Sequence, residues 1–84
     1  MKKKYILIVC GGTSSERQIS LKSGKACANA IKDLKYKFLI FDPAKENFNK
    51  IKNFKVDIIF NALHGRDGED GIAQSYFEYF KIPY

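Results

Sequence analysis

The feature that most constrains the fold is a short apolar run that stops at two glycines. Residues 5–9 read Tyr-Ile-Leu-Ile-Val, and Cys10 leads directly into Gly11 and Gly12. A continuous apolar run of this length, ended by a glycine turn, is typical of a strand that is buried on both faces of a parallel sheet. Because a helical pattern follows, the chain is predicted to pass from a strand through a glycine turn into a helix. Open α/β sheets place functional groups at such turns, at the carboxyl ends of the strands.

The apolar patterns along the rest of the chain predict an α/β domain. Three strands separated by crossover segments imply a parallel sheet with right-handed connections, so we expect the strand order 2-1-3. Residues 82–84 predict the start of a fourth strand, before which the sheet is truncated. The expected elements are a strand over 4–10, a helix capped at Thr13 or Ser15 and running to about Leu34, a strand over 37–42, a short helix or irregular crossover within 44–55, a strand over 56–61, and a helix from about Glu69 to Phe80.

The ends and faces of the helices also follow from the pattern. Glu16 lies three residues after Thr13, and Gln18 lies three residues after Ser15, so the sequence contains two overlapping capping boxes. Apolar and small residues at helical spacing predict which side of each helix packs on the sheet. The expected inner faces are Ile19, Ser23, Ala26, Cys27, Ala30, Ile31 and Leu34 in the first helix, and Ile72, Tyr76, Phe77 and Phe80 in the last.

Length, charge and cysteine usage restrict the function classes. The 84 residues form at most one small domain. The net charge of +6 comes mostly from scattered lysines, whereas nucleic-acid binding favours clustered basic residues with exposed aromatics, so we expect no nucleic-acid partner. The first apolar run is too short to span a membrane. Both cysteines lie in apolar patterns, which suits a reduced, cytoplasmic protein without disulfides.

The glycine turn admits two kinds of ligand. Backbone N–H groups at a helix N-terminus bind anions, but this turn lacks the third glycine of a dinucleotide fingerprint and the Gly-Lys-Ser/Thr of a P-loop. Glu16 fits a cation instead, because a carboxylate at a helix N-terminus is a good partner for an ammonium group. The local pattern alone favours a role for Glu16 in the capping box of Thr13, and the two roles are not fully exclusive.

His64 is the only histidine, and it lies just past the third predicted strand, in the turn over 61–71. At the carboxyl edge of a sheet, beside another strand's glycine turn, a functional role is about as well supported as that of an ordinary polar loop residue. The carboxylates Asp67, Glu69 and Asp70 lack the spacing of a calcium loop, and no Cys/His set has zinc spacing. We therefore expect no metal site in this chain.

Taken together, the two turns resemble one enzyme family. Residues 11–24 read Gly-Gly-Thr-Ser-Ser-Glu-Arg-Gln-Ile-Ser-Leu-Lys-Ser-Gly, residues 61–71 read Asn-Ala-Leu-His-Gly-Arg-Asp-Gly-Glu-Asp-Gly, and residues 82–84 read Ile-Pro-Tyr. Over its whole length the chain is similar to the D-alanine–D-alanine ligases, which are ATP-grasp enzymes of peptidoglycan precursor synthesis. The resemblance implies a three-layer, Rossmann-like domain of the pre-ATP-grasp type, located N-terminally on the substrate side of the ligase.

The resemblance also implies a reaction and a set of site residues. ATP, with magnesium bridging its phosphates, would phosphorylate one D-alanine, and the amine of a second D-alanine would attack the acyl phosphate to give the dipeptide. By family analogy, Glu16 is the catalytic and substrate-binding residue that pairs with the ammonium group of the first D-alanine. Ile19 falls on the apolar position near the substrate methyl group, and His64 falls on the pocket histidine. No position of this chain falls on a family residue that binds ATP or metal.

The ATP-grasp lysines, the magnesium carboxylates and the lid loop of such ligases belong to later domains. We therefore expect residues 1–84 to be inactive alone and to act with the remaining domains of the same chain. The resemblance also suggests a homodimer. Two alternatives stay open, namely a related ligase that makes D-alanine–D-lactate or D-alanine–D-serine, and a stand-alone βαβ module that binds ligands or partners without catalysis.

Overall fold

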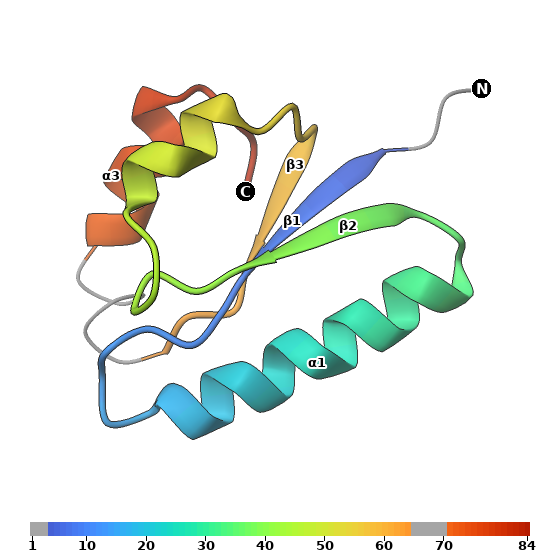
Figure 1. Cartoon of the computed structure of the whole chain (residues 1–84), viewed down its shortest axis with the longest axis horizontal. Helices are drawn as coiled ribbons and strands as arrows, with labels where there is room; N and C mark the ends of the chain where they lie inside the picture. Colours follow the sequence, from blue (N-terminus) through green and yellow to red (C-terminus); the bar gives the residue numbers. More distant parts are fainter. Residues whose placement is uncertain (1–3, 65–70) are drawn as a thin grey trace.

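Three parallel strands form the centre of the structure, and helices cover both faces of the sheet (Figure 1). The computed structural model describes residues 4–64 and 71–84. The strand order is β2-β1-β3, and β1 is parallel to both neighbours, which confirms the predicted α/β fold and the order 2-1-3. The elements are β1 (Tyr5–Val9), α1 (Arg17–Asp33), β2 (Lys37–Phe41), the 3-10 helix η1 (Phe48–Asn53), β3 (Ile58–Asn61) and α3 (Ile72–Tyr79).

The central strand β1 is buried on both faces, as predicted. Because side chains alternate along a strand, Leu7 and Val9 enter one face of the sheet, whereas Ile8 and Cys10 enter the other. None of these four side chains is more than 2% exposed. Cys10 also donates its backbone N–H to the carbonyl of Phe41 at 3.0 Å, so the hydrogen bonding to β2 continues past the end of β1.

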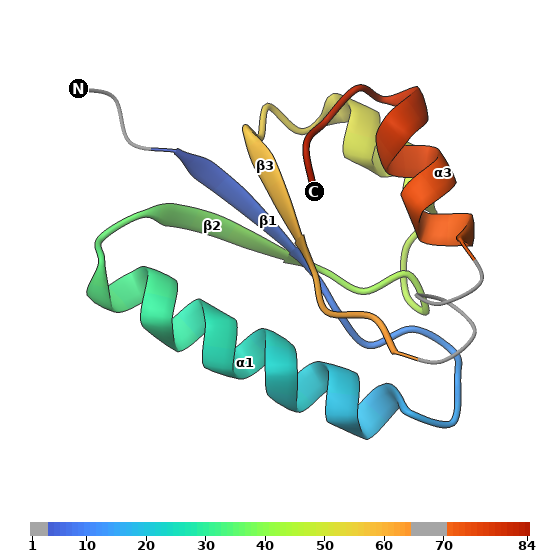
Figure 2. The same cartoon turned by 180° about the vertical axis from the view of Figure 1, so that it is seen from behind.

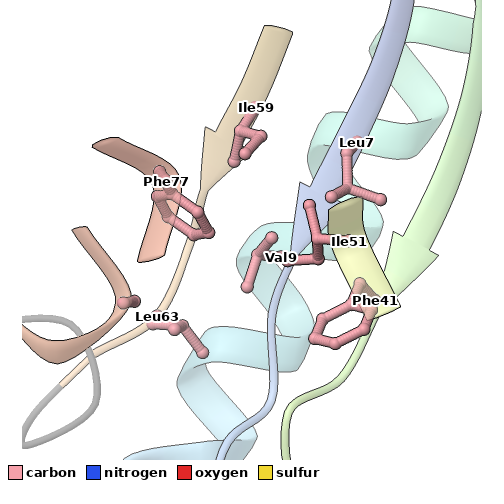
Figure 3. Packing of buried hydrophobic residues seen from close by; sticks show 8 residues of the cluster. Leu7, Val9, Phe41, Ile51, Ile59, Leu63 and Phe77 are labelled. Atoms are coloured by element: carbon pink, nitrogen blue, oxygen red, sulfur yellow. The ribbon is translucent and has the colours of Figure 1, made fainter. Parts of the chain in front are cut away.

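The face under η1 and α3 contains the bulky side chains, and we call it the aromatic face (Figure 3). The rings of Phe48 in η1 and Tyr76 in α3 stack with their centroids 4.8 Å apart. Ile51 is fully buried, so the short helix predicted around Phe48 and Ile51 exists, with 3-10 geometry. The buried members of this face are Leu7, Val9, Phe41, Ile51, Ile59, Leu63, Ala73 and Phe77.

The opposite face lies under α1, which packs on it through the small residues Ser20, Gly24 and Ala28, and we call it the small-residue face. Gly24 of α1 packs so closely on the sheet that a Cβ at this position would lie 2.5 Å from the Sγ of Cys10. Ser20 of α1 is fully buried. The small residues Ser20, Gly24 and Ala28 on the buried side of α1 let the helix approach the sheet closely. The buried hydrophobic members of this face are Ile8, Cys10, Ala28, Ile31 and Ala62.

The prediction of which side of α1 faces the sheet was partly wrong. The row of Ser20, Gly24 and Ala28, spaced four residues apart, is buried instead of the row that contains Ile19. A serine and a glycine add nothing to an apolar pattern, yet the close approach at Gly24 and the hydrogen bonds of Ser20 fix the rotation of the helix. Of the predicted inner face, Ile31 is buried, Ser23 and Cys27 are half-buried, and Ile19, Ala26, Ala30 and Leu34 are exposed.

The helix α1 begins later than predicted. Its N-cap is Glu16, whose side chain makes no capping hydrogen bond. Ser14 forms the turn before the helix, because its carbonyl accepts the N–H of Arg17 at 3.2 Å and its Oγ accepts the N–H of Glu16 at 3.2 Å. Thr13 and Ser15 therefore lie outside the helix, and the prediction that either of them is the N-cap was wrong.

The C-terminal part packs against β3. The predicted first residues of the last helix, Glu69 and Asp70, lie outside the described residues, and α3 is described from Ile72. Of its predicted inner face, Phe77 is buried and Tyr76 and Phe80 are half-buried, but Ile72 is 49% exposed and Ala73 is buried in its place. The segment after α3 returns to the sheet beside β3 (Figure 2), where the N–H of Ile59 donates to the carbonyl of Pro83 at 2.8 Å. This hydrogen bond is the kind expected at the start of a fourth strand, although no strand is assigned in residues 82–84.

The helices α1 and α3 each end with a lysine in the left-handed conformation. Lys35 follows α1 with φ of 62°, and Lys81 follows α3 with φ of 59°. The residue after each lysine donates its N–H to the helix carbonyl five residues earlier, at 3.2 Å and 3.1 Å. This is the Schellman arrangement, in which glycine is the usual residue at the left-handed position.

Candidate functional site

The turns after β1 and β3 lie side by side at the carboxyl edge of the sheet. The N–H of Ala62 donates to the carbonyl of Val9 at 2.8 Å. The buried hydroxyl of Ser20 joins both turns to α1, because its Oγ accepts the N–H of Gly11 at 2.8 Å and donates to the carbonyl of Ala62 at 2.7 Å. One hydroxyl group therefore fixes the helix, the glycine turn and the end of β3 relative to one another.

Asp42, which directly follows β2, holds the glycine turn from the other side. Its carboxylate accepts the N–H of Gly12 at 3.0 Å and forms a salt bridge with Arg17 at 2.7 Å. The Nη1 of Arg17 also donates to the carbonyl of Gly12 at 2.9 Å. Gly11 and Gly12 have φ values of 95° and 80°, and a Cβ at Gly11 would lie 2.6 Å from the Cγ of Asp42. Glycine at position 11 is therefore required by both the backbone conformation and the adjacent carboxylate.

Asp42 and Arg17 bind each other and Gly12, and we call this pair the clamp. It was not predicted from the sequence. The available signal was position, because Asp42 ends a strand that neighbours β1, and parallel strands bring their carboxyl ends to the same edge of the sheet. Arg17 gave no signal of its own, since it stands at the start of a helix where an exposed arginine is unremarkable. The pairing spans 25 residues of sequence, so no local pattern reveals it.

The clamp contradicts the interpretation of the glycine turn as a phosphate cradle. The N–H groups of Gly11 and Gly12 already donate to Ser20 and Asp42. The Asp42 carboxylate also places a negative charge against the turn, where a phosphate would need positive potential. The turn after β1 therefore does not fit the phosphates of ATP.

The pKa values of Asp42 and Cys10, both at this edge, are shifted from their ordinary values. Partial burial raises the pKa of Asp42, but the hydrogen bonds from Arg17, Gly12 and Ala44 and the charge of Arg17 together outweigh it, so the pKa lies below its usual value. Burial, followed by the charge of Asp42, raises the pKa of the Cys10 thiol. Cys10 is therefore a neutral core residue at neutral pH rather than a reactive thiolate.

Glu16 presents its side chain to solvent at the N-terminus of α1. Its backbone is held on both sides, because its N–H donates to Ser14 Oγ at 3.2 Å and its carbonyl accepts the N–H of Ser20 at 3.0 Å. Within residues 4–64 and 71–84, its carboxylate has neither a capping hydrogen bond nor an ion-pair partner. The capping role that the local pattern favoured is wrong, and the carboxylate is suited to a cationic ligand.

His64 is half-buried against the first turns of α1. Its carbonyl accepts the hydroxyl of Ser14 at 2.8 Å, and its Nε2 lies 3.5 Å from the Oγ of Ser23. Ile19 is 55% exposed. It follows Glu16 by three residues and precedes Ser23 by four, so these three residues lie along one face of α1. The structure thus brings Glu16, Ile19 and His64, the three predicted site residues, to the same end of α1.

Other parts of the predicted site fall outside this description. The rest of the second turn, residues 65–70, including the charged residues Arg66 and Asp67, lies outside the described residues. Within the described ranges, no group of three or more His, Cys, Asp or Glu side chains is arranged to hold a metal ion. Among those same residues, no helix combines the length and apolar character needed to cross a membrane.

Comparison with known protein families matches the C-terminal half of this chain to a family model. The family model described as "D-ala D-ala ligase N-terminus" matches residues 40–84, which is more than half of the chain. This match includes β3, His64 and α3 but not Glu16.

Individual relatives match almost the whole chain. It is 45% identical over 84 residues to D-alanine–D-alanine ligase B of Mesorhizobium japonicum, an alignment that covers 100% of this chain and 27% of that protein. It is 52% identical over 81 residues to D-alanine–D-alanine ligase of Pelagibacter ubique, covering 96% of this chain and 27% of that protein. The chain thus spans about a quarter of the length of these curated relatives.

A solved structure shows the same fold. The crystal structure of D-alanine–D-alanine ligase from Bacillus anthracis complexed with ATP superposes with a TM-score of 0.83 at 32% sequence identity. The superposition covers 100% of this chain and 28% of that one.

Proposed function

The chain belongs to the D-alanine–D-alanine ligase family, as its N-terminal domain, and we propose that it supplies substrate-binding residues to an ATP-dependent ligase that joins two D-alanines. The observation that carries the proposal is the position of the Glu16 carboxylate. It is exposed at the N-terminus of α1, has no partner among the described residues, and is held by its backbone to the turn that contains His64. A zwitterionic amino acid offers the ammonium group that such a carboxylate binds.

Each of the three residues has a distinct role in this proposal. Glu16 pairs with the ammonium group of the first D-alanine and so fixes the position of the carboxylate that reacts. Ile19, one helical turn further along α1, offers an exposed apolar side chain to the substrate methyl group. His64 forms the neighbouring wall of the pocket and is held against α1 near Ser23. Positioning of this kind accelerates a reaction by removing the entropic cost of bringing the reacting groups together.

The Gly12 N–H of the glycine turn already donates to the Asp42 carboxylate, which disfavours an ATP phosphate there. By family resemblance, the residues that bind ATP and Mg²⁺ belong to later domains. We assign both to other domains of the same protein, and ATP would activate the substrate carboxylate there. The Bacillus anthracis ligase that superposes on this chain was crystallised with ATP, which supports ATP use by the family. The proposal includes a cytoplasmic location, a role in peptidoglycan precursor synthesis and a homodimeric enzyme.

The test is phosphate release from ATP by the protein encoded by the full reading frame, measured with and without D-alanine. We expect D-alanine-dependent release with dipeptide as the product, and a decrease of about 10² or more in Glu16→Gln, the scale of a lost substrate-positioning contact. Glu46→Gln is the matched control, because the Glu46 carboxylate forms an ion pair with the exposed Lys50. Unchanged release by a folded Glu16→Gln protein would remove Glu16 from the site.

Product analysis separates the remaining alternatives. D-alanine–D-lactate or D-alanine–D-serine as the preferred product would assign the protein to a related ligase with a different second substrate. No D-alanine-dependent release at all would contradict the ligase proposal and would support a binding module without catalysis.

A further inference from the structure

We propose that Ser14 is a positioning residue that holds Glu16 in register with His64, so that both residues contact the same substrate molecule; this inference rests on the function proposed above. The Ser14 hydroxyl makes two hydrogen bonds in opposite senses. Its Oγ accepts the N–H of Glu16 at 3.2 Å, and its proton is donated to the carbonyl of His64 at 2.8 Å. A single half-buried hydroxyl therefore connects the backbones of the two predicted substrate residues.

The two turns are attached to each other at two different depths. At the base, the fully buried Ser20 joins Gly11 to Ala62. Ser14 makes the second attachment further out, next to Glu16 and His64 themselves. Since the base attachment keeps the turns together without Ser14, loss of the outer hydrogen bond is expected to displace the substrate residues without unfolding the domain.

A purely local role for Ser14 accounts for only one of its two bonds. Serine side chains commonly accept the N–H two residues later in turns, and this explains the hydrogen bond from Glu16. The donation to His64 crosses 50 residues of sequence and contributes nothing to the local turn. The neighbouring Ser15 is exposed. It provides a matched control in the same turn.

The experiment uses steady-state kinetics of the full-length enzyme, with D-alanine and ATP varied separately. We expect Ser14→Ala to raise the half-saturating D-alanine concentration about tenfold, the size of one lost hydrogen bond of ordinary strength, and to leave the half-saturating ATP concentration unchanged. Ser14→Thr, which keeps the hydroxyl, is expected to restore most of the affinity for D-alanine. Ser15→Ala is expected to behave as wild type.

A double-mutant cycle with Glu16→Gln separates positioning from a general structural effect. If Ser14 acts through Glu16, Ser14→Ala causes little further loss of D-alanine affinity in the Glu16→Gln background, because the carboxylate that Ser14 positions is already missing. The inference would be overturned if Ser14→Ala raised the half-saturating D-alanine concentration by the same factor in both backgrounds. It would also be overturned if the half-saturating ATP concentration rose as much as that of D-alanine. A Ser14→Ala enzyme with wild-type kinetics would overturn it as well. Thermal unfolding of each variant identifies a folding defect. If Ser14→Ala has such a defect, Ser14→Cys replaces it, because the thiol is a weaker donor of similar size, and we expect an intermediate rise in the half-saturating D-alanine concentration.

The two proposals fail in different ways. A wild-type protein without D-alanine-dependent phosphate release would overturn the proposed function together with this inference. An active wild type that is impaired by Glu16→Gln but not by Ser14→Ala would overturn the inference alone.

Discussion

The aromatic face of the sheet buries Phe41, Ile51 and Phe77 under η1 and α3, whereas the small-residue face brings Gly24 of α1 against Cys10 of the sheet. The first face removes a large apolar area from water, which is the main source of folding stability. The second face buries less, but it brings α1 close enough for the Ser20 hydroxyl to reach two strand ends. The difference shows that large buried side chains stabilise this domain, whereas the small residues on the buried side of α1 determine where the N-terminus of that helix, and with it the candidate site, lies.

The largest effect is expected from removing bulk on the aromatic face. Phe77 is fully buried, so Phe77→Ala leaves a cavity and should lower the free energy of unfolding by about 3–5 kcal/mol. Urea unfolding measures the loss. Tyr79→Ala on the same helix is the control, because Tyr79 is 81% exposed and its truncation should change stability by less than about 0.5 kcal/mol. Similar losses in both variants would contradict the conclusion that buried bulk on the aromatic face stabilises the domain.

Adding bulk to the small-residue face is the opposite change, but it should also destabilise the folded domain. Alanine is better than glycine inside a helix by about 0.5–1 kcal/mol, yet a Cβ at position 24 would lie 2.5 Å from the Sγ of Cys10 and 2.7 Å from its Cβ. Overpacking of this kind costs about 1–3 kcal/mol, so Gly24→Ala should be destabilising overall. We expect it also to weaken D-alanine binding, because α1 must shift away from the sheet. A more stable Gly24→Ala protein in urea unfolding would show that α1 can move freely.

The carboxyl edge of the sheet and the aromatic face should also differ in how their contributions to stability depend on pH. The pKa of Asp42 is lowered in the folded chain, so its contribution to stability is present above the ordinary aspartate pKa of about 3.9 and is lost as the pH falls through the folded value. Asp42→Asn should therefore be less stable than wild type at pH 7, and the gap should narrow below about pH 4. Urea unfolding between pH 7 and pH 3 tests this. The deficit of Phe77→Ala, which involves no ionisable group, should not follow the same curve.

The smallest effect is expected at the C-terminal ends of α1 and α3, which have the same backbone conformation on the two faces. Lys35 and Lys81 end the helices of opposite faces in the left-handed conformation, which costs a non-glycine residue about 1 kcal/mol or more. Lys35→Gly and Lys81→Gly should each relieve part of this cost and stabilise the chain by up to about 1 kcal/mol in thermal unfolding. Lys25→Gly, in the middle of α1, is the control and should destabilise, because a helix interior disfavours glycine.

The sequence was sufficient for the parts of the fold that depend on apolar patterns. The double burial of β1 and the strand order follow from continuous apolar runs and from the handedness of crossovers. The rotation of α1 could not be predicted in this way, since Ser20 and Gly24 determine it through a hydrogen bond and a close contact. Glu16 and His64 could be proposed because each stands at a strand-to-helix turn. Asp42 and the bridging roles of Ser14 and Ser20 required the structure, because each has one hydrogen-bond partner that lies 30 to 50 residues away.

The contact between Gly11 and Asp42 also limits how this domain can change over evolutionary time. Any side chain at position 11 would meet the Asp42 carboxylate at 2.6 Å. A smaller residue at position 42 would make room, but it would also remove the acceptor of the Gly12 N–H and the partner of Arg17. Neither position can therefore drift by single neutral steps, and we expect lineages that lose one of these two residues to have replaced the other as well.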